Sequence, residues 1–257
     1  YSDFVAILYK KTDDLCKYIN TLLQNDENIY VKESAKGQAS PLLHKALMSE
    51  LDFFEELAKI TCDDVKEIID TNIYLPEWTN SNISVKEEYI KKIDSIKTTG
   101  YGIYATHRMF LYKDNEIIPV KYPDPQRLSQ MSGYELERQK VIDNTMALLQ
   151  GKPCNNVLLY GDAGSGKSST IKAIVNEYWE MGLRLIEIKK NQLYSLPDVI
   201  EKLADNPLKF IIFIDDLSFS TNDSDFGALK AILEGGVAGK TDNLAIYATS
   251  NRRNLVK

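Results

Sequence analysis

The chain has 257 residues, of which 44% are apolar and 26% charged, the balance of an ordinary globular protein. This length allows one large domain or two modest ones. The formal net charge of −6 does not favour nucleic-acid binding by the protein as a whole, although it does not exclude a local basic patch. No apolar run approaches the roughly 20 residues of a membrane span. We therefore expect a cytoplasmic protein with no membrane partner.

The three cysteines, Cys16, Cys62 and Cys154, lie far apart in the sequence. No two of them have the spacing of metal ligands, and their odd number argues against a disulfide framework. The pattern predicts inert or buried thiols in a reducing compartment.

Residues 1–99 have the apolar spacing of α-helices and form the first predicted region. Apolar side chains recur at helical intervals over residues 4–23, which predicts one first helix. A polar stretch at 25–40 separates it from the next helix, which starts with Ser40 as its cap and Pro41 as its first residue.

Two more helix starts follow in the same region. Thr61 with Asp64 predicts the cap of a short helix, and Ser84 with Glu87 predicts that of another, which reaches about Ile96. The apolar stripes indicate core packing, and no residue in this region carries recognisable chemistry.

A boundary follows at Gly100 and Gly102. Residues 103–120 are rich in Tyr, Phe and Ile, and three prolines lie between positions 119 and 125. Proline fixes φ and stiffens the chain, so residues 100–125 are predicted to form a hairpin or an extended linker.

From residue 126 to 257, apolar strand-like runs alternate with helical patterns. This alternation predicts an α/β fold, in which a parallel sheet carries helices on both faces. The expected strands are 157–160, 183–188, 210–215 and 244–249, and the expected helices are 134–149, a helix after the first strand to about 181, 195–203 and 226–233.

The most informative segment joins the strand 157–160 to a glycine-rich loop that ends in Gly-Lys-Ser. It matches the P-loop pattern G-x-x-x-x-G-K-[ST] in the required strand–loop–helix context. Glycine lets the loop approach a phosphate closely, and the loop amides then form an anion nest at a helix N-terminus. A chance match in a Gly/Ser loop is the alternative, and the flanking strand and helix argue against it.

The P-loop predicts a nucleoside triphosphate with Mg²⁺ as the ligand. Lys167 is expected to reach the β- and γ-phosphates, and the Ser168 hydroxyl to bind Mg²⁺. The loop grips phosphates, so it does not define the base. The predicted phosphate-binding residues are Gly161, Asp162, Ala163, Gly164, Ser165, Gly166, Lys167, Ser168 and Ser169.

Polar residues end two later strands. Asp215 and Asp216 follow the apolar strand at 210–214, whose carboxyl end opens at the ligand edge of such a sheet. Asp215 is expected to hold Mg²⁺, and Asp216 to orient the attacking water as a base. The alternative is a strand end that leaves two charges in solvent.

Asn251 follows the last predicted strand and is the third catalytic candidate, as a hydrogen-bond partner of the attacking water or the phosphate. Thr249 is the next candidate in this segment. A strand-end turn that satisfies its own backbone is the alternative. Arg252 and Arg253 either balance phosphate charge or form a solvated basic turn.

Together these motifs resemble those of the AAA+ ATPases: 161–168 matches their Walker A, 211–216 their Walker B and 248–252 their sensor 1. The resemblance covers about residues 126–257. Within the class, five segments resemble the uncharacterised bacterial family called domain of unknown function 815. These segments are 155–161, 183–188, 215–219, 233–236 and 247–253.

The resemblance implies ATP with Mg²⁺, a ring or arc of identical subunits that supply an arginine in trans, and a protein or nucleic-acid client. It also implies that the segment 126–135, including Tyr134, helps to seat the base. Two features depart from the AAA+ pattern. Asp216 stands where glutamate is usual, and the sequence ends at Lys257, before a fifth strand and a helical lid, so we expect the native protein to be longer.

Three functions are open. The first is an ATPase that remodels or recruits a macromolecule, and a relative of the DNA-helicase loaders would share this core. The second is a nucleotide-dependent switch with little hydrolysis, which the shorter side chain of Asp216 favours. The third is a small-molecule P-loop kinase, disfavoured because no acceptor-binding residues are recognisable.

Overall fold

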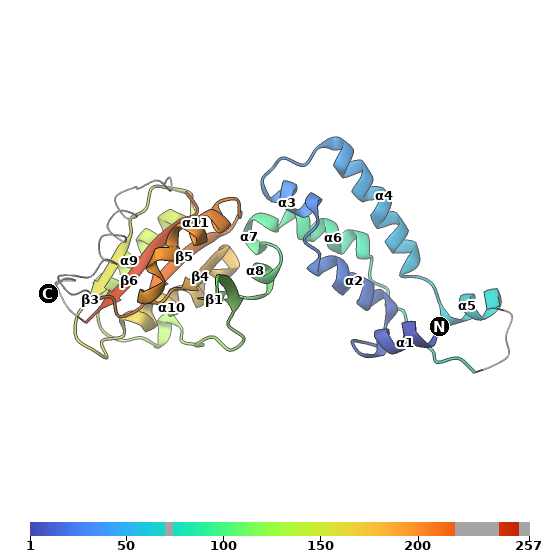
Figure 1. Ribbon diagram of the computed structural model, residues 1–257, viewed down its shortest axis with the longest axis horizontal. Helices are drawn as coiled ribbons and strands as arrows, with labels where there is room; N and C mark the ends of the chain where they lie inside the picture. The colour runs from blue at the N-terminus through green and yellow to red at the C-terminus, as the bar shows by residue number, and fades with distance from the viewer. Residues whose placement is uncertain (70–73, 219–241, 252–257) are drawn as a thin grey trace. The chain divides into compact units, whose positions relative to one another are not determined.

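The computed structural model describes residues 1–69, 74–218 and 242–251. The predicted helix at 226–233 and the two arginines at 252 and 253 lie outside these ranges. The chain divides into two compact units, Tyr1–Ile96 and Lys97–Lys257 (Figure 1). Among the described helices, none combines the length and apolar character needed to cross a bilayer.

The first unit is helical, as predicted. Its elements differ from the prediction near the start, where residues 4–23 form two helices instead of one. Asp14 interrupts them because its extended backbone and its carboxylate, which accepts the Lys17 amide, make it a helix N-cap. The helices are α1 (Ser2–Tyr9), α2 (Leu15–Asn25), α3 (Ile29–Ala35), α4 (Pro41–Leu57), α5 (Cys62–Ile69) and α6 (Val85–Asp94), followed by α7 (Ile96–Thr99).

The three predicted caps are confirmed. Ser40 accepts the amide of Leu43, with Pro41 in the first turn of α4. Thr61 and Asp64 accept each other's amides at the start of α5. The Ser84 hydroxyl accepts the Glu87 amide at the start of α6.

Two other details of this unit differ from the prediction. The polar stretch 25–40 contains α3, which Asn28 caps by accepting the Val31 amide. The helix expected to reach residue 96 ends at Asp94, and α7 follows. Short polar helices of this kind depend on tertiary packing, so the apolar pattern alone does not reveal them.

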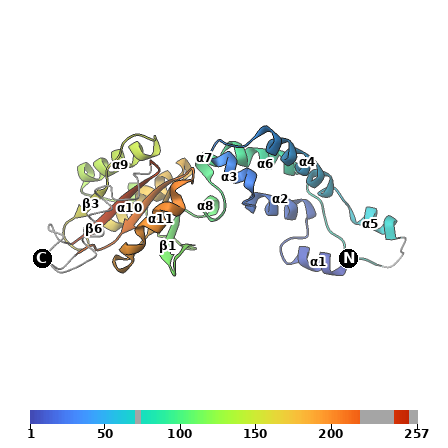
Figure 2. The ribbon, with the colours of Figure 1, turned by 45° about the horizontal axis from the view of Figure 1, so that its top comes forward.

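Helices α2 and α4 both pack on α6, as two views of the ribbon show (Figures 1 and 2). A second set of contacts joins the amino-terminal helices to the segment around Trp78, whose ring meets Tyr1 and Phe4. The buried members of this core are Val5, Leu8, Leu15, Cys16, Ile19, Ala58, Cys62, Trp78 and Val85.

The second unit is built on a six-stranded sheet of order β2-β1-β4-β5-β6-β3. All neighbours are parallel except β1 and β2, so the sheet is mixed. Residues assigned above to a hairpin or linker form β1 and β2, and β1 extends the sheet by pairing with β4. The strands are β1 (Met109–Lys113), β2 (Glu116–Pro119), β3 (Val157–Tyr160), β4 (Leu183–Glu187), β5 (Lys209–Ile214) and β6 (Leu244–Ser250).

Helices cover both faces of this sheet, as predicted. α9 (Glu135–Leu149) and α10 (Lys167–Tyr178) pack on one face, and α11 (Leu196–Ala204) packs on the other. The central strand β5 sends Ile211 and Phe213 to the first face. Phe210, Ile212 and Ile214 face α11. Both faces are buried, which explains why β5 lacks polar alternation.

A buried arginine on β4 connects the segment before β1 to the sheet through hydrogen bonds. Arg184 on β4 is only 1% exposed, and its guanidinium donates to the carbonyls of Thr99, Tyr104 and Trp179. Burial lowers the pKa of Arg184 to about 10. Carbonyl partners compensate part of the desolvation of this charge.

Candidate nucleotide-binding site

The predicted site residues meet at one edge of the sheet because three strands end there. β6 lies between β3 and β5, and Tyr160 of β3 is level with Ser250 of β6. Ile214 of β5 is level with Ala248. The loops that leave β3, β5 and β6 at their carboxyl ends therefore converge, as in other open α/β sheets that bind ligands at this edge.

The loop after β3 has the backbone that its glycines allow. Gly161, Gly164 and Gly166 have φ values of 149°, 78° and 80°, which side chains with a Cβ rarely adopt. Gly166 is the N-cap of α10, and its carbonyl accepts the Thr170 amide. The helix thus starts at Lys167, and its first turn presents amides and a positive dipole end to an anion.

Lys167 is held at the mouth of this loop. Its ammonium donates to the carbonyls of Gly161 and Asp162 at 3.0 and 2.7 Å. It also donates to the Ser165 hydroxyl at 3.3 Å and to the Asn251 side-chain oxygen at 3.1 Å. The lysine from the P-loop and the asparagine from the end of β6 are therefore neighbours.

The two residues predicted to bind Mg²⁺ touch each other. The Ser168 hydroxyl donates to Asp215 Oδ1 at 2.6 Å, and the Asp215 side chain is exposed. A hydroxyl and a carboxylate are oxygen donors of the type that Mg²⁺ takes. No cluster of three His, Cys, Asp or Glu side chains occurs in the described ranges, so a cation here would need phosphate oxygens and water as its other ligands.

Asp216 has a left-handed backbone, with φ at 50°. Its amide donates to Thr249 Oγ1 at 3.0 Å, and its carboxylate accepts Asn251 Nδ2 at 2.9 Å. Aspartate is one of the few residues enriched at positive φ. This backbone gives a physical reason for aspartate at a position where the family resemblance leads one to expect glutamate.

Thr249 does not have the role predicted for it. It is 1% exposed, so its hydroxyl does not face solvent or a phosphate. That hydroxyl instead donates to the Asp215 carboxylate and accepts the Asp216 amide. Thr249 is therefore a positioning residue for both acidic groups, and its burial follows from the place of β6 inside the sheet.

The segment before α9 reaches the P-loop. The Met131 sulfur lies 4.0 Å from the Thr170 hydroxyl, and a Cβ added at Gly166 would lie 3.5 Å from the Met131 methyl. Tyr134, named above as a base-seating candidate, is 64% exposed and caps α9 in a left-handed conformation. Met131 is therefore the member of this segment that lies against the loop.

One further residue was missed by the sequence reasoning. Asn176 on α10 is 3% exposed, and its amide nitrogen donates to the carbonyls of Asp124 and Gln126. Its side-chain oxygen accepts the Arg108 guanidinium at 2.6 Å. These bonds fix the proline-containing connector beside the P-loop helix. An asparagine on the buried face of a predicted helix was the available signal.

The P-loop, the two aspartates after β5 and Asn251 thus lie in one constellation. The loop tip is exposed and the residues at the helix start are half-buried. Hydrogen bonds connect Lys167 to Asn251, Asn251 to Asp216, and Ser168 to Asp215. The P-loop, the acidic end of β5 and the polar end of β6, arranged in this order, define a P-loop NTPase fold of the AAA+ type.

Comparison with known proteins agrees with this class. The family described as "Protein of unknown function (DUF815)" matches residues 105–257, and the chain belongs to it. The match covers the second unit from just before β1. The resemblance and the fold class predicted from the sequence are both confirmed.

Two curated relatives are similar over part of the chain. The replication factor C large subunit of Staphylothermus marinus is 30% identical over 123 residues, and that of Thermofilum pendens is 29% identical over 120 residues. These matches cover 44% and 43% of this chain but only 28% of each relative. The solved C. elegans PCH-2 is similar with 19% identity and a TM-score of 0.37 over 48% of this chain and 38% of its own.

Proposed function

We propose that the second unit binds ATP with Mg²⁺ and hydrolyses it, and that hydrolysis drives the remodelling or recruitment of a macromolecular client. The observation that carries this proposal is the chain of hydrogen bonds from Lys167 through Asn251 to Asp216. It joins the P-loop to a carboxylate at the mouth of the same site. A glycine-rich loop with only a structural role would not require these hydrogen bonds to the polar ends of β5 and β6.

Each group has a role that follows from its chemistry. Lys167 and the amides at the start of α10 bind the phosphates and balance their charge. Ser168 and Asp215 hold Mg²⁺, which supplies neutralisation of the charge that develops on the phosphate oxygens. Thr249 keeps the Asp215 carboxylate turned toward Ser168.

Asp216 and Asn251 face the attacking water. The Asp216 carboxylate accepts a proton or a hydrogen bond from that water, and the Asn251 amide fixes the orientation of the carboxylate. Asn251 also contacts Lys167, so a change in the position of Lys167 when phosphate binds or leaves would be transmitted to Asn251.

The test is a pair of measurements on each variant, ATP binding and ATP turnover. Asp216→Asn should keep binding and lose turnover by about 10²–10⁴-fold, the range for removal of a general base. Asp242→Asn, at an exposed carboxylate in front of β6, is the matched control and should leave both unchanged. Unchanged turnover in Asp216→Asn would remove Asp216 from the mechanism, and turnover that survives Lys167→Ala would overturn the assignment of the site.

A second function is supported by one feature, the short Asp216 side chain on a left-handed backbone. It is a nucleotide-dependent switch that binds ATP but hydrolyses little. Here Asp216→Asn would change neither binding nor a turnover that is already negligible. Asp216→Glu then separates the two proposals. If the short reach of the Asp216 carboxylate limits hydrolysis, as the switch proposal holds, the longer side chain should raise turnover; if Asp216 already acts as the base, it should not.

The remaining expectations are part of the proposal. The base is adenine, and Met131 contacts it beside the loop. Identical subunits assemble in a ring or arc, and each supplies an arginine to its neighbour's site. The client is a protein or a nucleic acid, and the protein acts in the cytoplasm. The curated relatives are matched over 28% of their length, so their names do not define a client.

A further inference from the structure

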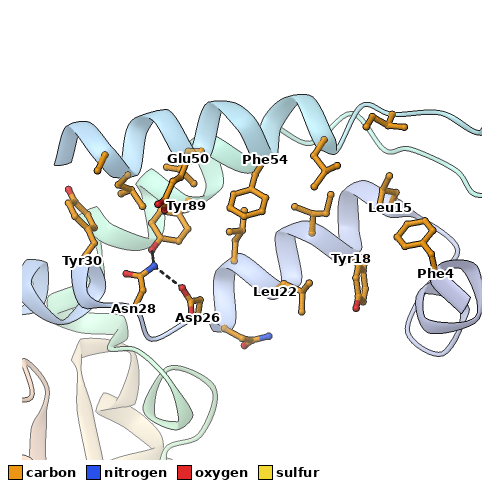
Figure 3. Close-up of a pocket in the computed structure, with 18 of the residues that line it drawn as sticks. Phe4, Leu15, Tyr18, Leu22, Asp26, Asn28, Tyr30, Glu50, Phe54 and Tyr89 are labelled. Carbon is orange, nitrogen blue, oxygen red and sulfur yellow. Dashed lines mark hydrogen bonds between the residues drawn. The ribbon is translucent and has the colours of Figure 1, made fainter. Parts of the chain in front are cut away.

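A large apolar groove lies within the first unit, between α2 and α4. Both helices pack on α6, whose Tyr89 ring forms part of the floor and is 1% exposed. The cavity measures about 1240 Å³, above the ~300–1,000 Å³ typical of small-molecule sites. Figure 3 shows Phe54 pointing from α4 toward α2, and Leu22 lies at the outer edge of the α2 wall.

The lining residues follow the helical repeat on both walls. On α4 they run from Leu43 to Leu57, about 21 Å at about 1.5 Å per residue. On α2 they run from Leu15 to Leu23. The groove therefore extends along the helices for several turns, which is the shape that another α-helix fills.

The rim of the groove is open and apolar. Leu22 is 55% exposed, Ile29 is 65% exposed and Phe4 is 40% exposed. An acyl chain would be enclosed on all sides by a closed pocket. An amphipathic helix buries one face and leaves the other in water, so it fits a groove with an open rim.

Charged side chains lie where α2 ends, opposite the middle of the α4 wall. Asp26 and Glu50, one from each wall, are the charged side chains among its described lining residues. Asn28 donates to the Asp26 carboxylate at 2.7 Å and to the Tyr89 hydroxyl at 3.0 Å, which holds that carboxylate in place. The nearby Lys92 ammonium is engaged by the backbone carbonyls of Leu23 and Asp26.

The whole unit has the same sign of charge. Residues 1–96 contain 18 Asp and Glu against 11 Lys and no Arg. A partner with positive charge is therefore attracted to this unit and is oriented by the two carboxylates where α2 ends.

We infer that the groove between α2 and α4 binds an amphipathic helix of a partner protein, with an apolar face of about four turns and a lysine or arginine midway along it. The apolar face packs between Leu22, Phe54 and Tyr89, and the basic side chain meets Asp26 and Glu50. This binding needs neither nucleotide nor the second unit's site, so it stands or falls separately from the proposed ATPase.

The test uses the full chain and a fluorescent synthetic peptide of about 16 residues, about 24 Å long as a helix. The peptide has leucine at helical spacing on one face, lysine in a middle turn at the edge of that face, and alanine and glutamine elsewhere. A scrambled peptide of the same composition and a peptide with glutamate in place of lysine are the controls. We expect saturable binding of the basic peptide, at least about tenfold tighter than of either control.

Variants locate the binding. Leu22→Asp places a charge in the groove at a side chain already 55% exposed, and Ala46→Trp fills the groove instead. Both should weaken peptide binding about tenfold or more. Leu42→Asp, at a 79% exposed position on α4 outside the lining, is the matched control and should bind normally, with circular dichroism verifying that each variant is folded.

Three results would overturn the inference. The first is equal binding of the basic and scrambled peptides. The second is displacement of the peptide by a fatty acid whose own binding is weakened by Leu22→Asp, which would make the groove a lipid site. The third is a dimer of the full chain that Leu22→Asp and Ala46→Trp dissociate, which would make a second copy the occupant.

Discussion

The two units of this protein have different kinds of candidate site, one polar and one apolar. In the second unit, a loop and two strand ends gather ammonium, hydroxyl, carboxylate and amide groups within hydrogen-bond distance of one another. In the first unit, two helices line a groove with apolar side chains over an apolar floor, with charged side chains where α2 ends. A site of the first kind recognises charge and fixed geometry, and one of the second kind recognises shape and apolar area.

This contrast predicts that the two sites fail independently. The largest effect is expected for Lys167→Ala, which should weaken ATP binding on the order of 100-fold because it removes a charge-assisted contact to phosphate. The same variant should bind the groove peptide as the unaltered chain does. Calorimetric titration with each ligand measures both, and a parallel loss of peptide binding would contradict the separation.

A second prediction concerns the residue that holds the acidic pair. Thr249→Val removes the hydroxyl that serves Asp215 and Asp216, leaving the Asp216 amide with only its 3.2 Å bond to Asp215 Oδ1. We expect a loss of about 1–3 kcal/mol in the free energy of unfolding of the second unit and a fall of about tenfold in turnover. Thr249→Ser keeps the hydroxyl and should restore both. Denaturant melts and an ATPase assay measure the two effects, and a Thr249→Ser variant as impaired as Thr249→Val would point to lost packing instead.

Salt should also separate the two sites. Phosphate binding at Lys167 depends on charge, so raising ionic strength should weaken ATP binding by severalfold. Peptide packing between Leu22 and Phe54 depends on apolar burial, so the groove should keep most of its affinity. A groove affinity that falls as steeply as the ATP affinity would show that Asp26 and Glu50, not the apolar walls, supply the binding energy.

The smallest effect is expected from Asp14, which caps α2 beside the groove. Burial raises its pKa, but the amides of Lys17 and Ser81 and the Ser81 hydroxyl outweigh burial, so the net pKa lies below the usual range for aspartate. A carboxylate with a lowered folded pKa stabilises the fold above its unfolded pKa, near 3.9, and that stability is lost as pH falls through the folded value.

Asp14→Asn should therefore flatten the acid side of the stability profile of the first unit. Thermal melts followed by circular dichroism between about pH 6 and pH 2 measure it, with Asp94→Asn, at the exposed last residue of α6, as control for a solvent-facing carboxylate. Equal acid dependence in Asp14→Asn and the unaltered chain would remove Asp14 as a source of stability.

The same contrast explains how much the sequence could predict. The P-loop is a local pattern, because the residues that bind phosphate are consecutive and the strand and helix around them have clear periodicity. Asp215 and Asn251 could be placed beside it because the carboxyl ends of parallel strands share an edge. The buried strand β5 could also be predicted from a local pattern, its continuous apolar run.

What could not be predicted depends on contacts between distant residues. The role of Thr249 required β6 to lie inside the sheet, between β3 and β5. The pairing of β1 with β4 required knowing which strand edge was free. The groove required the packing of α2 and α4 on α6, whereas the apolar stripes of those helices indicated only a core. The division between α1 and α2 had a local signal, the Asp14 cap, which the longer apolar periodicity obscured.

The central claim is that the site around Lys167 binds Mg-ATP. Its most direct test is calorimetric titration of ATP, with and without Mg²⁺, into the full chain and into Lys167→Ala. The account predicts saturable, Mg²⁺-dependent binding to the unaltered chain and a loss on the order of 100-fold in the variant, in which the control ligand, the groove peptide, still binds. Equal ATP affinity in the two proteins, or no binding to either, would contradict it.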